Sequence, residues 1–145
     1  MPHSLAMKGA CHCGAVQFSV VLSDGLDEPR RCNCSYCRMR GSVVVTAAVD
    51  DITIESGADE LSLYQFNTHA ARHYFCSRCG ISTHHRRRSN PSLLSVNTAC
   101  LKGISPFDFS SVPVYEGVVY RDSGVPGDEG EIAGALFFVK SDSAE

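Results

Sequence analysis

The stretch Cys32-Asn33-Cys34-Ser35-Tyr36-Cys37 places three thiols within six residues. In an extended segment, side chains two residues apart point to the same side, so Cys32 and Cys34 can converge on one point. A tight turn over residues 35 and 36 can bring Cys37 to that point as well. Three soft sulfur ligands suit Zn²⁺, which binds thiolates at about 2.3 Å and prefers four ligands. The stretch therefore predicts a zinc site with one position left for water or a substrate.

Four further cysteines form two short pairs, one before and one after this triplet. Cys11 and Cys13 have C-x-C spacing, and Cys76 and Cys79 have C-x-x-C spacing. The two pairs together complete a four-thiol zinc site, which leaves the triplet with an open position. Joining them also closes a long loop whose entropy would otherwise oppose folding. Other groupings remain open, among them a second structural zinc in which Cys100 or a histidine closes the triplet.

The composition restricts the classes of protein to which the chain can belong. Its 145 residues suffice for one domain with a buried core, and a formal charge of −3 with a pI near 6.0 argues against nucleic-acid binding. No apolar run approaches the roughly 18 residues of a membrane helix, and the N-terminus lacks the apolar segment of a signal peptide. We therefore expect a cytoplasmic protein with no membrane partner, whose eight cysteines bind metal rather than form disulfides.

Short β-prone runs separated by turn residues predict a mainly β domain. Residues 1–10 are interpreted as an irregular lead-in, Asp50-Asp51 as a turn between two strands, and 124–130 as a Gly/Asp/Pro-rich loop. The expected strands are 15–22, 43–49, 52–55, 61–66, 81–85 and 93–97, two strands within 112–120 around a turn at Glu116-Gly117, and 135–139 as a strand or a docked tail. We expect a single domain over residues 1–145, with a core from about 8 to 120 and a C-terminal tail from about 121 to 145.

The order and spacing of the three cysteine groups resemble those of a known family. Cys11-x-Cys13-Gly14, Cys32-x-Cys34-x-x-Cys37 and Phe75-Cys76-x-x-Cys79-Gly80 are similar to the glutathione-dependent formaldehyde-activating (GFA) family, which includes the centromere protein V domain. The resemblance implies the Mss4-like fold of coiled antiparallel sheets, with two zinc ions per chain. It places a structural zinc on Cys11, Cys13, Cys76 and Cys79, and a second zinc, where the activity lies, on Cys32, Cys34 and Cys37.

The resemblance also implies a reaction, that of a zinc-binding carbon–sulfur lyase similar to S-(hydroxymethyl)glutathione synthase. Such an enzyme joins a thiol such as glutathione to a small aldehyde such as formaldehyde, or splits the product. Cys32, Cys34 and Cys37 are then the candidate catalytic residues, because their zinc would lower the pKa of the thiol or polarise the carbonyl. The alternative is a zinc-stabilised module that carries a thiol or docks a protein without catalysis. An exchangeable fourth zinc ligand favours the enzyme, and a protein ligand favours the module.

Arginine and histidine residues supply further candidates. Four arginines flank the triplet and would favour thiolate over thiol: Arg30, Arg31, Arg38 and Arg40. In the basic run 86–88, Arg87 is the central candidate to bind the carboxylates of glutathione, since guanidinium groups suit carboxylates. The alternative interpretation of this run is a solvated loop. Three histidines near the Cys76–Cys79 pair are weaker candidates for contact with a ligand or metal: His73, His84 and His85.

Overall fold

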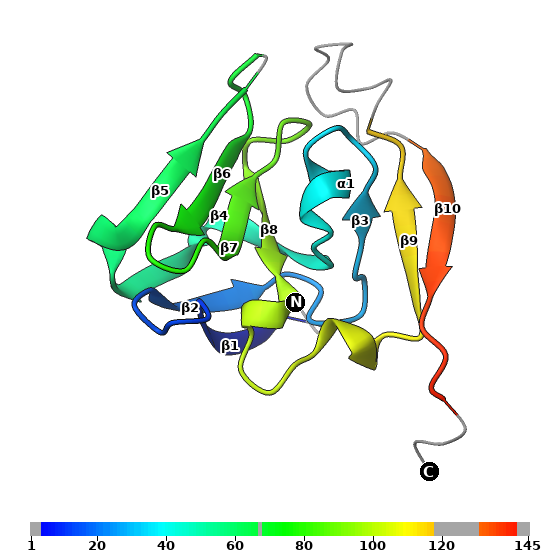
Figure 1. Ribbon diagram of the computed structural model, residues 1–145, viewed down its shortest axis with the longest axis horizontal. Helices are drawn as coiled ribbons and strands as arrows, with labels where there is room; N and C mark the ends of the chain where they lie inside the picture. The colour runs from blue at the N-terminus through cyan, green and yellow to red at the C-terminus, as the bar shows by residue number, and fades with distance from the viewer. Residues whose placement is uncertain (1–3, 67, 118–130, 142–145) are drawn as a thin grey trace.

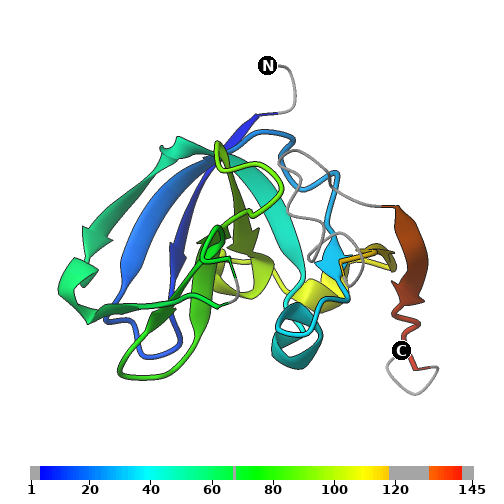
Figure 2. The same cartoon turned by 90° about the horizontal axis from the view of Figure 1, so that it is seen from above.

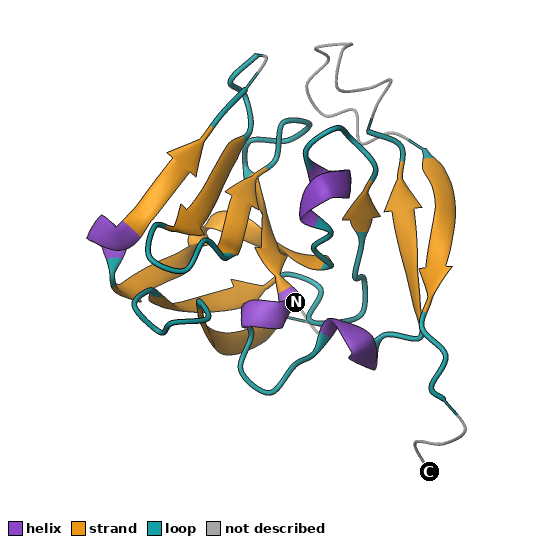
Figure 3. Cartoon of the chain, viewed as in Figure 1, coloured by secondary structure: helices purple, strands orange, loops and turns teal. Residues whose placement is uncertain are grey.

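A computed structural model describes residues 4–66, 68–117 and 131–141, and most of the regular structure in these ranges is β-strand (Figure 3). The prediction of a mainly β protein is therefore confirmed. The strands form two sheets, of seven and three strands. In the same ranges no helix is both long and apolar enough to cross a membrane.

The larger sheet has the strand order β1-β2-β4-β8-β7-β6-β5, and each neighbouring pair is antiparallel. Figure 1 shows β1 and β2 at the bottom of the molecule and β5 to β7 at its left, so the sheet curls. Its strands are β1 (Leu5–Ala10), β2 (Gln17–Leu22), β4 (Val44–Ser56), β5 (Leu61–Tyr64), β6 (Arg72–Cys76), β7 (Ser82–Arg86) and β8 (Leu93–Asn97).

The smaller sheet has the order β10-β9-β3, from β3 (Arg31–Cys32), β9 (Ser111–Tyr115) and β10 (Ile132–Phe137). β10 runs antiparallel to β9, whereas β3 runs parallel to it. The short helix α1 (Cys37–Arg40) follows β3 directly. Figures 1 and 2 show β10 at the edge of the molecule, with β3 and α1 between it and the larger sheet. Three 3-10 helices complete the described elements: η1 (Ala58–Glu60), η2 (Thr98–Cys100) and η3 (Pro106–Asp108).

The main apolar core lies against β2, β4 and β8. Phe18, Val20 and Leu22 alternate along β2 and are all buried, as a strand with one covered face requires. They pack with Val45, Ala47, Leu94, Val96, Cys100 and Leu101. Fully burying one such side chain stabilises the fold by about 1.5–3 kcal/mol. This core holds together the strands from which the cysteine-bearing loops emerge.

Two of the expectations about local structure are wrong. Residues 5–10 are not an irregular lead-in, because they form β1, which pairs with β2 along its whole length; residues 1–3 lie outside the described residues. Asp50-Asp51 is not a turn, because both residues lie within β4, which spans 13 residues from Val44 to Ser56 and shifts register against β2 between Ala47 and Ile52. Both aspartates are exposed on this strand, so their charges remain in water. Two charged residues between β-prone runs are found both in the exposed part of a long strand and in a turn between two short strands, so the local amino-acid sequence does not distinguish the two.

The C-terminal expectations were correct in part. The last predicted segment forms a strand, β10, which begins at Ile132 and therefore lies within the proposed tail. The first of the two strands predicted around Glu116-Gly117 is confirmed as β9, which ends at Tyr115. Residues 118–120 of the second strand and the predicted loop over 124–130 lie outside the described residues.

Candidate metal centres

Cys11, Cys13, Cys76 and Cys79 come together although the two pairs are far apart in the sequence. The Sγ–Sγ distance is 3.6 Å between Cys11 and Cys13, and 3.8 Å between Cys13 and Cys76, 63 residues away. All four Sγ atoms lie within 4.8 Å of one another. A tetrahedral zinc ion with bonds of about 2.3 Å separates its sulfur ligands by about 3.8 Å. The four thiols can therefore hold one metal ion, and they fit tetrahedral zinc.

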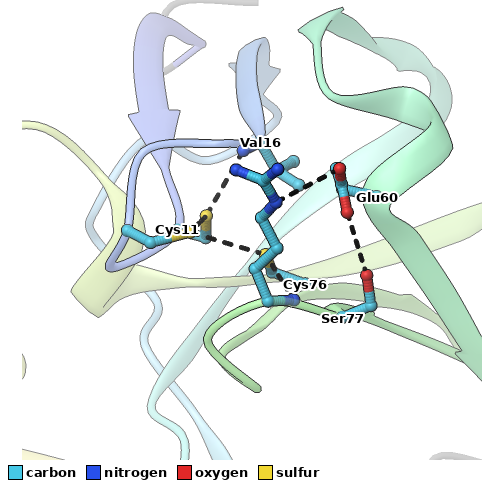
Figure 4. Close-up of polar contacts among 7 residues, drawn as sticks. Cys11, Val16, Glu60, Cys76 and Ser77 are labelled. Atoms are coloured by element: carbon cyan, nitrogen blue, oxygen red, sulfur yellow. Dashed lines mark hydrogen bonds and ion pairs between the residues drawn. The ribbon is translucent and has the colours of Figure 1, made fainter.

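Backbone amides orient two of these sulfur atoms. Val16 N donates to Cys11 Sγ at 3.3 Å (Figure 4), and Arg78 N donates to Cys76 Sγ at 3.4 Å. Gly80 follows the C-x-x-C pair with a φ of 78°, a left-handed conformation that glycine adopts without strain. Amide donors favour the thiolate form, and this is the form that binds metal. The local backbone is thus arranged for a bound cation.

Glu60, at the end of η1, ties down the turn between Cys76 and Cys79. Its carboxylate accepts a hydrogen bond from Ser77 Oγ at 3.2 Å and forms an ion pair with Arg78 at 3.3 Å (Figure 4). Its carbonyl oxygen also accepts a hydrogen bond from Ser77 N at 2.8 Å. The turn that carries two ligands is therefore anchored to a neighbouring element as well as to β6 and β7.

The triplet is assembled from three successive backbone conformations. Cys32 ends β3, Cys34 follows it in a loop, and Cys37 is the first residue of α1. Their Sγ atoms lie within 4.8 Å of one another, so the predicted convergence is confirmed. Cys34 N donates to Cys32 Sγ at 3.4 Å, and Cys37 N donates to Cys34 Sγ at 3.3 Å. Hydrogen bonds from Cys32 and then Cys37 lower the pKa of Cys34, which favours its thiolate form.

Residues 116 and 117, just after β9, pack against the triplet. Gly117 N donates to Asn33 Oδ1 at 2.7 Å, and Asn33 Nδ2 donates to Glu116 Oε1 at 3.1 Å. A Cβ atom at Gly117 would overlap Cys32 Sγ and would approach Cys34 Cβ to 3.0 Å. Glycine is required at this position because the backbone passes so close to the thiols.

A pocket of about 120 Å³ opens beside the triplet and is strongly cationic. All three cysteines line it, and Glu116 is the one acidic residue that the described part of the chain contributes to its wall. The arginines that line it are Arg30, Arg31, Arg40, Arg87 and Arg88. Because guanidinium groups bind carboxylates well, the pocket suits an anionic ligand.

Arg87 is an internal residue of this pocket and is only 6% exposed. Its Nε donates to Ser95 Oγ at 2.9 Å, and its Nη2 donates to Thr46 Oγ1. Arg86 before it is the last residue of β7. The solvated-loop interpretation of the basic run is therefore wrong for Arg87, whose guanidinium is fixed by hydroxyl groups of β4 and β8.

Comparison with known proteins agrees with this arrangement. The model of the family described as glutathione-dependent formaldehyde-activating enzyme matches residues 6–112, which include every cysteine. The chain is a member of the GFA family. A Halomonas elongata protein named "Putative glutathione-dependent formaldehyde-activating enzyme" is 37% identical over 83 residues, and the match covers 52% of each protein. The chain thus spans about half the length of this curated relative.

A solved structure supports the fold of this GFA-family chain. The crystal structure of a Rhodobacter sphaeroides protein matches it with a TM-score of 0.73 and 52% sequence identity. The match covers 74% of this chain and 99% of that chain. Together with the two sheets and the cysteine clusters, the family membership agrees with the predicted Mss4-like β fold.

The triplet of this GFA-family chain gains no fourth protein ligand among the described residues. Its cluster contains three cysteines and no histidine or carboxylate. Cys100 lies in the main core, where its Sγ donates to Ser82 O at 3.5 Å and burial raises its pKa to about 12. His84 hydrogen-bonds Thr83 Oγ1 at 2.9 Å and stacks on Tyr74. Neither residue closes the triplet.

Two of the predicted histidines lie in a different place from the one expected. His73 in β6 and His85 in β7 lie opposite each other on neighbouring strands and line the triplet pocket. The Nδ1 atom of each ring is hydrogen-bonded to Arg40. From the sequence, the two histidines are expected near the Cys76–Cys79 pair, and Arg40 is only one of four cations near the triplet. The spacing of Arg40, three residues after Cys37 on a helix, is the signal that could have placed it against the thiols.

Proposed function

We propose that this GFA-family protein is a zinc-dependent carbon–sulfur lyase that adds a glutathione-like thiol to a small aldehyde, or catalyses the reverse reaction. The observation that carries the proposal is the pocket in which the three thiols lie among five arginines. Among the described residues, no fourth protein ligand joins these thiols. The family description and the name of the Halomonas elongata relative support formaldehyde as the aldehyde and glutathione as the thiol.

In this proposal the two cysteine clusters have different tasks. The four-thiol cluster would hold a structural zinc, and Cys32, Cys34 and Cys37 would hold a second zinc. That second zinc would supply a soft coordination position, which would favour a bound thiolate or polarise a carbonyl. Formation of the adduct makes one S–C bond and turns the carbonyl into a hydroxyl. The thiol loses its proton to solvent, and the oxygen takes one from solvent.

Arg87 is the residue we propose to bind a carboxylate of the thiol substrate. Because Ser95 and Thr46 already hold its side chain, the guanidinium loses little conformational freedom when a ligand arrives. Arg87→Lys should weaken glutathione binding, since an ammonium group cannot make the same bidentate contact. Arg78→Lys is the matched control, because Arg78 is exposed beside the other cysteine cluster.

Calorimetry with glutathione and S-methylglutathione tests the open coordination position. We expect glutathione to bind in the micromolar-to-millimolar range, more tightly as pH rises toward a thiol pKa of about 8.5, because the thiolate is the ligand. S-methylglutathione should bind much more weakly, since it cannot form a thiolate. Equal affinity for both ligands would contradict the proposal and would favour a non-catalytic, zinc-stabilised binding module.

The setting of this activity follows from the same chemistry. We infer that the chain acts as a single domain in the cytoplasm, where cysteine thiols stay reduced and can bind zinc. Its net charge of −3 gives no attraction to nucleic acid as a partner.

A further inference from the structure

Arg40 connects the triplet with two histidines. Its Nη2 donates to Cys37 Sγ at 3.3 Å and contacts His85 Nδ1 at 3.3 Å. Its Nη1 contacts His73 Nδ1 at 3.1 Å. The Arg40 Cζ atom also lies 5.1 Å from the centre of the Tyr36 ring. One guanidinium group therefore holds a proposed zinc ligand and two imidazoles at the same time.

These contacts determine which nitrogen of each imidazole carries the proton. Arginine has five N–H donors and no acceptor, so His73 Nδ1 and His85 Nδ1 must both accept. A protonated imidazole has no acceptor nitrogen and cannot make this contact. Each ring is therefore neutral, and its proton is on Nε2. Arg40 fixes both rings as the same tautomer.

The environment of the two rings agrees with the neutral form. Burial and then the charge of Arg40 lower the pKa of His73 to about 4, and the same two causes lower the pKa of His85. The ring centres are 4.8 Å apart, and both residues line the triplet pocket. Across the described ranges, the hydrogen bonds of both rings are made at Nδ1. The Nε2–H groups are thus the donors that these residues can offer to a ligand.

We propose that His73 and His85, positioned by Arg40, donate hydrogen bonds from Nε2 to the aldehyde oxygen while the thiol adds to the carbonyl carbon. This inference rests on the proposed lyase function and extends it to residues outside the zinc ligands. Negative charge develops on the oxygen as the S–C bond forms, and donors already in place stabilise that charge. Neither imidazole loses its proton, and the alkoxide takes a proton from water.

Substitution of His85 tests the donor, because His85 is less buried than His73. His85→Phe removes the N–H, and we expect the rate of adduct formation from glutathione and formaldehyde to fall about 10²-fold. His85→Gln keeps an N–H donor and should recover part of the lost rate. The affinity for glutathione without aldehyde should change much less than the rate in both variants, because the donors act on the aldehyde oxygen. An unchanged rate in His85→Phe and in His73→Phe would overturn the inference.

Arg40→Gln tests the positioning role, with Arg38→Gln as the matched control on the exposed side of the same helix. Nitrogen NMR of the histidine rings in the zinc-loaded wild type should show a protonated Nε2 and an unprotonated Nδ1 for both residues. Arg40→Gln should give a mixture of tautomers and a slower reaction, and Arg38→Gln should change neither. A protonated Nδ1 in the wild type would overturn the inference.

The same experiments separate this inference from the proposed function. A wild type that binds zinc but does not accelerate adduct formation would overturn both. A wild type that is active, together with fully active histidine variants, would overturn only the role of His73 and His85.

Discussion

The two cysteine clusters contain the same type of ligand but differ in how the chain builds them. The four-thiol cluster joins residues 63 positions apart and is anchored by backbone amides and by Glu60. The triplet comes from one stretch of six residues and borders a pocket lined by five arginines. We therefore expect a metal ion held by the cluster that joins distant segments to stabilise the fold, and the local cluster beside the pocket to be available to a ligand.

This difference determines how much a zinc ion bound to each cluster is expected to contribute to the free energy of folding. Binding of a structural zinc can contribute on the order of 10 kcal/mol to folding. The net stability of a domain is about 5–15 kcal/mol, so loss of a zinc that joins two hairpins removes most of it. The triplet closes only a short loop, so a zinc ion bound there would contribute less to holding distant elements together.

The largest expected effect is the difference between single cysteine substitutions in the two clusters. Cys76→Ser should give unfolded or insoluble protein, because the four-thiol zinc is lost. Cys34→Ser should retain the fold and lower the zinc content from two ions per chain to one. Circular dichroism and elemental analysis measure both results. Equal loss of folded signal in the two variants would contradict the division of tasks.

An intermediate effect is expected from the close approach of the backbone to the triplet. Gly117→Ala puts a methyl group where Cys32 Sγ lies, so the thiols must shift and the affinity of this site for zinc should fall. Gly134→Ala, in β10, is the control because a methyl group there meets open space. Zinc release to a chelator should show one faster phase in Gly117→Ala and two unchanged phases in Gly134→Ala. A wild-type release profile in Gly117→Ala would show that the site tolerates the displacement.

The smallest expected effect concerns acid stability on the β6–β7 side of the molecule. Burial lowers the pKa of His84 from 6.5 to about 4. Between these values the unfolded state binds more protons than the folded state, so stability should fall as pH falls through this window and level off below about 4. His84→Gln should reduce this slope, as measured by urea denaturation of the zinc-loaded protein. His69→Asn is the control, because His69 is exposed, and it should leave the slope of stability against pH as it is in the wild type. If His84→Gln also keeps the wild-type slope, groups other than His84 cause the acid sensitivity.

Predictions from sequence were correct where the pattern was local. The alternation in β2 and the spacing of Cys32, Cys34 and Cys37 depend on a few neighbouring residues, and backbone geometry decides them. The prediction at Asp50-Asp51 was wrong because two exposed charges occur equally in a turn and in the solvent-facing part of a long strand. Arg87 was ambiguous for a related reason, since a basic run does not show which of its members faces inward.

Cysteine spacing and β-strand periodicity by themselves predicted the mainly β fold class and the convergent triplet, and the order of the cysteine groups indicated the family. They favoured the pairing of Cys11 and Cys13 with Cys76 and Cys79 but left other groupings open, and the structure brings these four thiols together. Only the tertiary structure decided which other residues meet those thiols. Arg40 comes from α1, His73 and His85 from β6 and β7, and Gly117 from the end of β9. These contacts join residues far apart in the sequence, and they depend on how the two sheets pack around the triplet. Local periodicity carries no information about such packing, because it records the direction of a side chain and not the group that the side chain meets.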